Sequence, residues 1–202
     1  MPYTMKMSHG HGRVVVGQLV DDAKSWQVWQ VYPGGETRRV DFRDGWRIPD
    51  PSELCTEVRM LNSLRSVCVF SCRIRFAVSQ QVKDAIESAE PGVHQFALLK
   101  VTPHKDQVIG TNYFMLNVCN RLRAIDGDRS SVPFSLHDGG TRKGYSLSGL
   151  PGTQFVVPHE AVSGKAVRMD EESLEHFVSD ELRDVITSHG ARNLEFVRVA
   201  EN

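Results

Sequence analysis

The sequence predicts an α+β fold, made of an N-terminal antiparallel β-sheet and a mixed region with two similar helix-strand units at about residues 76–101 and 176–200. Strand-like and helix-like segments follow one another without regular alternation, which favours this class over a doubly wound parallel sheet. In addition, a motif that begins at Val78-Ser79 recurs 100 residues later at Val178-Ser179. The 202 residues suffice for one sizeable core or for two small lobes.

The N-terminal part of the chain is expected to be rich in strands. Residues 1–12 are polar and contain two histidines between glycines, and we expect a flexible N-terminus there. Strand-like patterns follow at residues 13–20, 26–32 and 37–42. The sequence Pro33-Gly34-Gly35 between the last two indicates a turn, so these segments predict a small antiparallel sheet.

A helix is expected at residues 52–65, because leucine and valine recur there at helical spacing. It completes a predicted β-rich lobe of residues 13–66. Residues 67–78 alternate in the manner of one long strand, and they open a predicted α+β domain of residues 67–202. Further strands are expected at residues 111–118 and 155–157.

The repeated motif predicts a strand end, a capped helix and a second strand in each copy. Ser79 and Ser179 each follow a valine, and a serine hydroxyl can accept a hydrogen bond from the free amides of a first helical turn. Only the second copy has acidic residues in that turn, Asp180 and Glu181, where the helix dipole favours them. Gly92 and Gly190 end the helices, and strands are expected to follow both.

The composition excludes several classes of partner. The 24 basic and 25 acidic side chains nearly cancel, so neither nucleic acid nor an anionic membrane is indicated. We see no signal peptide and no apolar run of membrane-spanning length, and we expect a cytoplasmic protein. The four cysteines lack metal-ligand spacing and are expected to be free thiols.

The search for catalytic and metal-binding motifs finds none that is complete. The segment 144–148 resembles a nucleophile elbow but ends in serine instead of glycine, and His159-Glu160 lacks the second histidine of a zinc protease. His9 and His11 have no third ligand. The segment 126–130 starts like a calcium loop but is better interpreted as a turn held by aspartate. We therefore predict no catalytic residue, no metal site and no cofactor.

The segment from Phe76 to Ser130 resembles a known family in the order and spacing of its motifs. These motifs are Val78-Ser79 with Val82-Lys83-Asp84, Gly92-Val93 with Phe96, Tyr113-Phe114 with Leu116-Asn117-Val118, and Ala124-Ile125-Asp126 with Ser130. They resemble the immunity proteins of bacterial polymorphic-toxin systems, specifically immunity family eleven. The resemblance covers roughly residues 70–200, including the second copy of the repeat.

This resemblance implies a protein that binds a cognate toxin tightly and blocks its active site or substrate path. Toxins of such systems are often delivered by contact-dependent or type VI secretion. Two alternatives stay open: a ligand-binding or regulatory module with a pocket between the two repeat units, and a hydrolase whose site is assembled in space from His94, His104, His137 or His159. The oligomeric state also stays open, a homodimer included.

Two segments outside the repeated residues are the candidates for contact with a basic toxin surface. One is the acidic run from residue 170 to 184, and the other is the loop from residue 138 to 145. The candidate toxin-binding residues are Asp138, Arg142, Lys143, Tyr145, Asp170, Glu171, Glu172, Glu175, Asp180 and Glu181.

Overall fold

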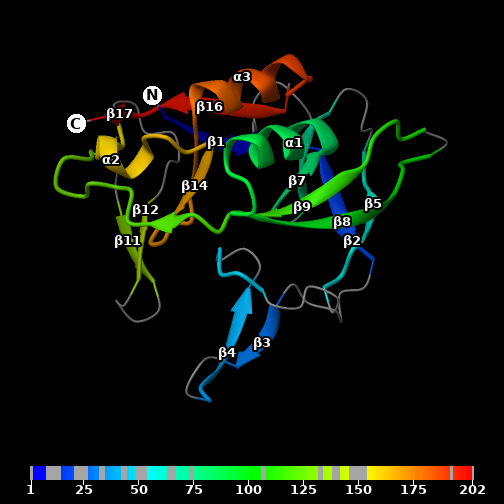
Figure 1. Ribbon diagram of the computed structural model, residues 1–202, viewed down its shortest axis with the longest axis horizontal. Coiled ribbons are helices and arrows are strands. Elements are labelled where there is room, and N and C mark those ends of the chain that lie inside the picture. Colours follow the sequence, from blue (N-terminus) through cyan, green and yellow to red (C-terminus); the bar gives the residue numbers. More distant parts are fainter. Residues whose placement is uncertain are drawn as a thin grey trace.

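The computed structural model in Figure 1 shows two packed β-structures, two helices side by side on one edge, and two hairpins on the opposite side. The structure describes residues 2–7, 15–20, 27–31, 35–41, 45–48, 54–62, 67–72, 75–105, 108–131, 134–137, 142–145, 154–191 and 193–201. These residues are mostly strand with a few helices, which confirms the predicted α+β class.

The first β-structure is a closed barrel with the strand order β2-β5-β8-β9-β7-β6. Its strands are β2 (Val16–Leu19), β5 (Glu57–Met60), β6 (Val69–Cys72), β7 (Arg75–Ser79), β8 (Gln95–Thr102) and β9 (Tyr113–Asn117). The interior is tightly filled: a Cβ added to Gly17 would lie 2.4 Å from Val58 Cγ1 and 3.0 Å from Phe70 Cε2. Only glycine therefore fits at this point of β2.

The second β-structure is a five-stranded sheet with the order β10-β14-β15-β1-β16. Its strands are β10 (Arg121–Leu122), β14 (Val167–Asp170), β15 (His176–Val178), β1 (Tyr3–Met7) and β16 (Leu194–Arg198). Helices α1 (Gln80–Ala89) and α3 (Asp180–Ser188) contact each other. In the described residues, no helix combines the length and the apolar character needed to cross a membrane.

Six short strands pair outside these two structures, and one short helix accompanies them. Strands β3 (Gln27–Val31) and β4 (Thr37–Asp41) form an antiparallel hairpin, as do β11 (Phe134–His137) and β12 (Arg142–Tyr145). Strand β13 (Val156–Val157) pairs in parallel with β17 (Ala200–Glu201), next to helix α2 (His159–Val162). Figure 1 shows the β3–β4 hairpin projecting away from the barrel.

The repeat seen in the sequence extends into both β-structures. The strand order β6-β7-β9-β8 in the barrel matches β14-β15-β1-β16 in the sheet, with α1 and α3 in equivalent places. The register agrees as well. In the barrel, Val78 lies opposite Phe114 and Phe96 opposite Leu116. In the sheet, Val178 lies opposite Tyr3 and Phe196 opposite Met5.

Equivalent residues of the two units also build one shared core. Val69, Val78, Val82 and Ile86 of the first unit pack in the same buried cluster as Val167, Val178, Leu182 and Ile186 of the second. Each unit also places a cation over an aromatic ring of its central strand. The Lys83 Nζ lies 5.5 Å from the Phe114 ring centre, and the Arg183 Cζ lies 4.3 Å from the Tyr3 ring centre.

The two predicted helix caps differ. The Ser179 hydroxyl accepts a hydrogen bond of 3.2 Å from the amide of Leu182, which confirms the cap of α3. The Ser79 hydroxyl accepts no such bond, and its buried oxygen has no hydrogen-bond partner. Both helices begin where predicted, but the serine side chain caps only the second.

The predicted helix at residues 52–65 is wrong. Residues 57–60 form strand β5, in which Val58 and Met60 are buried inside the barrel while Arg59 is exposed. The helical spacing that suggested a helix included Leu61, which is 51 % exposed. A burial period of two residues, set by pairing with β2 and β8, overrides that spacing.

Three further expectations need correction. The single strand predicted at residues 67–78 is a hairpin, in which Cys72 lies opposite Arg75. Strand β2 belongs to the barrel, so the predicted N-terminal sheet is reduced to the β3–β4 pair. Residues 3–7, within the segment expected to be flexible, form β1 between β15 and β16; residues 8–14 lie outside the described part. The barrel contains strands from before and after residue 66.

Candidate functional site

Asp170, one of the predicted toxin-binding residues, is deeply buried, with 1 % exposure. Its Oδ1 accepts hydrogen bonds from the amides of Ala124 at 2.8 Å and Ile125 at 3.3 Å. Its Oδ2 accepts from the amide of Ser173 at 2.7 Å, from the Ser173 hydroxyl at 2.8 Å, and from the amide of Glu172 at 3.2 Å. Asp170 therefore holds the β14–β15 turn and is not at the surface for a partner.

Glu171 and Glu172 follow on that turn and share one basic partner. The Arg123 Nε lies 2.8 Å from Glu171 Oε1 and 3.6 Å from Glu172 Oε1, and the Arg123 side chain is 75 % exposed. The hydrogen bond that Arg123 donates to Glu171 and the charges of both glutamates raise the pKa of Arg123. We name Arg123, Glu171 and Glu172 the acidic turn. Its ion pairs are exposed and weak, so a partner can replace them.

Glu175 lies at the end of the same turn but is largely withdrawn from water. Burial raises the pKa of Glu175 to about 7, although the charge of Lys6 opposes this shift. The carboxyl group of Glu175 is therefore protonated more readily than that of an ordinary glutamate. This residue is poorly suited to attract a basic surface.

Asp180 and Glu181 stand in the first turn of α3, at the other end of β15 from the acidic turn. Asp180 Oδ1 lies 3.5 Å from Arg183 Nη1, so its charge is partly compensated. Glu181 is exposed. The structure thus divides the acidic run between two places and does not gather it into one face.

The remaining candidates come from residues 138–145, the predicted loop. This segment overlaps the β11–β12 hairpin. Arg142, Lys143 and Tyr145 are residues of β12, and Tyr145 lies opposite Phe134. Asp138 lies outside the described residues. The segment expected as a loop thus ends in a short strand.

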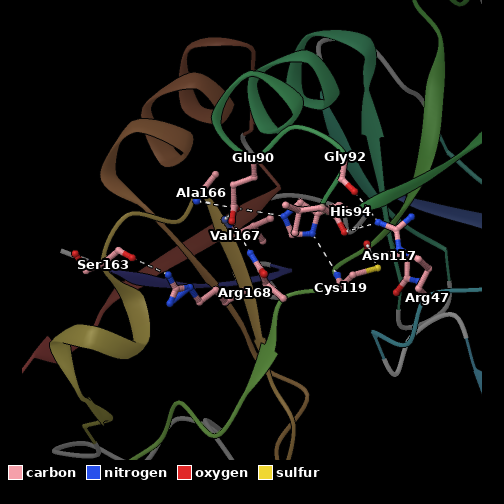
Figure 2. A network of polar contacts seen from close by, with 12 residues as sticks. Arg47, Glu90, Gly92, His94, Asn117, Cys119, Ser163, Ala166, Val167 and Arg168 are labelled. Carbon is pink, nitrogen blue, oxygen red and sulfur yellow. Dashed lines mark hydrogen bonds and ion pairs between the residues drawn. The ribbon is translucent and has the colours of Figure 1, made fainter.

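A buried network around Glu90 joins the two repeat units, and no sequence pattern singles it out (Figure 2). Glu90 Oε2 accepts hydrogen bonds from the amides of Ala166 at 2.8 Å and Val167 at 3.1 Å. His94 Nε2 lies 3.2 Å from the same oxygen, while the Asn120 side-chain amide donates to Oε1. The end of α1 is thereby fixed to the start of β14.

The same network determines the tautomer of His94. Its Nδ1 accepts a hydrogen bond of 3.2 Å from the amide of Cys119, so the proton lies on Nε2 and points to Glu90. Burial alone would raise the pKa of Glu90, but the hydrogen bonds from His94, Val167 and Ala166 lower it overall. Because Glu90 and His94 are both buried, this pair is structural.

A cavity of about 490 Å³ lies between α1, α2, α3 and β14. Its wall includes Arg168 of β14, which is 3 % exposed. In the strand sequence Val167-Arg168-Met169-Asp170, the apolar residues alternate with Arg168 and Asp170, so the sequence places the last two on one face. It gives no sign that both are buried, since burial here depends on α2 and on residues 121–125.

Residues proposed for a spatially assembled hydrolase do not come together in the described residues. His94 is committed to Glu90, and His159 Nδ1 lies 3.1 Å from Glu201 Oε2 near the surface. Another histidine, His176, is half-buried, and desolvation of its ring lowers its pKa to about 4. No group of three or more His, Cys, Asp or Glu in the described segments can hold a metal ion. Asp126 accepts hydrogen bonds from the amides of residues 128 and 129, which confirms the predicted turn.

Comparison with known proteins identifies the family. The model of the Immunity protein family (Imm11) matches residues 8–201, which include every described strand from β2 to β17. A search of curated proteins found no match. Because the match spans nearly the whole chain, the barrel, the sheet and the repeated units all lie within it. The chain therefore belongs to the Imm11 immunity protein family.

Proposed function

We propose that this protein neutralises a cognate bacterial toxin by binding it in the cytoplasm and covering its active site or substrate path. Membership of the Imm11 family carries this proposal. In the same proposal, the toxin reaches the cell by contact-dependent or type VI secretion. The immunity protein then protects the producing cell and its kin.

The distribution of polar groups supports a binding role. The buried carboxylates of Glu90 and Asp170 are used to hold backbone segments together. An occluding inhibitor needs a complementary surface and no chemistry of its own. The exposed groups that remain available are therefore the ones to test.

The acidic turn is the first proposed contact, because Glu171 and Glu172 outnumber Arg123 and present a net negative charge. The β11–β12 hairpin, with Asp138, Arg142, Lys143 and Tyr145, is the second. Asp180 and Glu181 form a third contact beside the cavity. Asp170 and Glu175 lie at the two ends of the β14–β15 turn. In this proposal they fix the conformation of the turn and do not contact the toxin.

The β3–β4 hairpin adds a candidate that sequence reasoning did not include. Trp29 is 70 % exposed and Val31 is 72 % exposed, and the alternation of a strand places both on one face. An isolated two-stranded hairpin is only marginally stable in water. Tryptophan is also among the residues that contribute most to binding at protein interfaces. Contact with the toxin would cover this face.

The deciding experiment is co-expression of the cognate toxic domain with and without this chain. We expect cells to grow only when the chain is present, and equal death in both cultures would refute the proposal. Charge reversal then tests the surface. Glu171→Lys with Glu172→Lys should weaken toxin binding at least about tenfold, or about 1.4 kcal/mol.

Glu160→Lys is the matched control for the charge reversal, because Glu160 is exposed on α2 and away from the acidic turn. It should leave the affinity unchanged. Equal affinities for the double variant and the control would remove the acidic turn from the interface, while the neutralising role would stand on the co-expression result.

A further inference from the structure

Arg168 is a buried cation without a counter-ion among the described residues. Its Nη2 donates one hydrogen bond of 3.0 Å to the carbonyl oxygen of Ser163. Its Nε is buried and has no hydrogen-bond partner, and no described carboxylate lies at ion-pair distance. A guanidinium has five N–H donors, so most of this hydrogen-bonding capacity is unused by the protein.

Such a residue is costly to keep. Burial lowers the pKa of Arg168, although the charge of Glu90 opposes the shift. Arginine nevertheless stays protonated in proteins, so the charge itself is buried. Buried charges without partners destabilise a fold, and natural proteins retain few of them. A role in packing alone would be served better by an apolar side chain of similar length.

The cavity lined by Arg168 has the size and walls of a ligand site. Its volume of about 490 Å³ is within the range of small-molecule pockets. Helices α1 and α3 contribute aliphatic wall residues, among them Ala85, Ala89, Leu182 and Val185. His159, Lys165, Glu181 and Glu201 also line it. The two carboxylates balance the charges of Lys165 and Arg168, which disfavours a multiply charged anion and leaves room for a singly charged one.

We propose that this cavity binds a monocarboxylate with an apolar body, whose carboxylate pairs with the free donors of Arg168. The planar fork of a guanidinium matches a carboxylate, and two parallel hydrogen bonds make such a pair strong and directional. The aliphatic walls take the apolar body. The carboxylate belongs either to a free organic acid or to a carboxyl group of the bound toxin. Binding of a free monocarboxylate to the cavity can be tested whether or not the protein neutralises a toxin.

Titration calorimetry of the full chain with hexanoate tests this site. Hexanoate should bind with a stoichiometry of one, whereas hexylamine and inorganic phosphate should bind much more weakly. Arg168→Met should reduce hexanoate affinity at least about tenfold, the size of a charged hydrogen bond. The same variant should melt no lower than the natural chain, because it removes an uncompensated buried charge.

A pair of variants on α1 keeps the test decisive if Arg168→Met does not fold. Ala89→Trp fills the cavity from an exposed helix position and should abolish hexanoate binding. Ser88→Trp, one residue away and exposed outside the cavity, should leave it unchanged. The proposal is overturned if hexanoate fails to bind, or if it binds Ala89→Trp as well as Ser88→Trp.

Competition distinguishes the two sources of the carboxylate. If hexanoate displaces the toxin domain, the carboxyl group belongs to the toxin; if both bind together, it belongs to a free organic acid. A chain that neutralises the toxin but does not bind hexanoate refutes the cavity proposal alone.

Discussion

Glu90 shows how a single carboxylate can fix the position of several segments. It accepts hydrogen bonds from two backbone amides of the second unit, from His94 and from Asn120. These four donors share the two oxygens of one carboxylate, so both oxygens must act as hydrogen-bond acceptors. A glutamine of the same size offers one accepting oxygen and brings two donor hydrogens into a site that already contains donors.

We therefore predict that Glu90→Gln destabilises the protein by about 2–4 kcal/mol, measured as the free energy of unfolding in urea. Glu87→Gln, on the same helix and only half-buried, should change it by less than about 0.5 kcal/mol. Similar losses in the two variants would show that the Glu90 network contributes little.

Glu90 should also make the free energy of unfolding depend on pH. The pKa of Glu90 is lowered from 4.5 in the folded state, so its stabilisation is complete above the unfolded value and is lost as the pH falls through the folded pKa. The difference in unfolding free energy between the natural chain and Glu90→Gln should therefore shrink below about pH 4.5.

Contacts between residues that are distant in the chain explain why the sequence did not reveal the buried Glu90 network or the burial of Asp170. Glu90 is separated from Ala166, Val167 and Asn120 by 30 or more positions in the chain, and neither Glu90 nor Arg168 stands in a local motif. Asp170 was identified from the sequence, but as a surface charge. The density of acidic residues could be seen there, whereas the amides of residues 124 and 125 that bury Asp170 could not.

At the scale of elements, the duplicated helices offer a matched experiment within one molecule. Both start after a serine, but only the Ser179 side chain caps its helix. The first turns differ as well: α3 has Asp180 and Glu181 there, and α1 has no acidic residue. The Ser79 hydroxyl is instead buried without a partner.

Ser179→Ala should therefore cost about 1 kcal/mol of unfolding free energy, the usual contribution of an N-cap. Ser79→Ala should cost nothing or stabilise the fold, since it removes an unsatisfied buried hydroxyl. Thermal and urea unfolding of both variants will check this. An equal loss at the two positions would mean that Ser79 also caps its helix in solution.

Elements with strong local signals were predicted well, and those that depend on pairing were not. Helices α1 and α3 each have a serine before the first turn, an apolar stripe and a glycine after the last turn, all within the segment itself. Strand β5 has no such signal, because its pairing with β2 and β8 determines its conformation. Strand β1 looked like a flexible end because its partners lie more than 170 residues further along the chain.

For the whole molecule, the two units differ mainly in how the central strand is connected. In the barrel, β8 continues through residues 103–112 into β9. In the sheet, the equivalent strand is β1, which precedes the rest of the chain. The ends that would be joined already lie together, since Tyr3 is opposite Arg198 and the amide of Val199 donates to the carbonyl oxygen of Pro2 at 3.1 Å.

This arrangement predicts that a circular permutant will fold. A flexible linker of about ten residues from Glu201 to Pro2 spans roughly 17 Å and makes the second unit continuous. New ends between Asp106 and Gln107 then open the first unit, beside Val108, which is 91 % exposed. Closing the chain between Glu201 and Pro2 and opening it after Asp106 leaves the strand pairing unchanged. The permutant should therefore unfold cooperatively and melt within about 5 °C of the natural chain.

A second permutant with the same linker provides the control. Its new ends lie between Met115 and Leu116, inside β9, where both neighbouring strands pair. It divides the central strand of the barrel and should not unfold cooperatively, as followed by circular dichroism. If neither permutant unfolds cooperatively, the linker between β16 and β1 disrupts the sheet, and the two units cannot exchange their connections. If both unfold cooperatively, an unbroken β9 is not needed to complete the first unit.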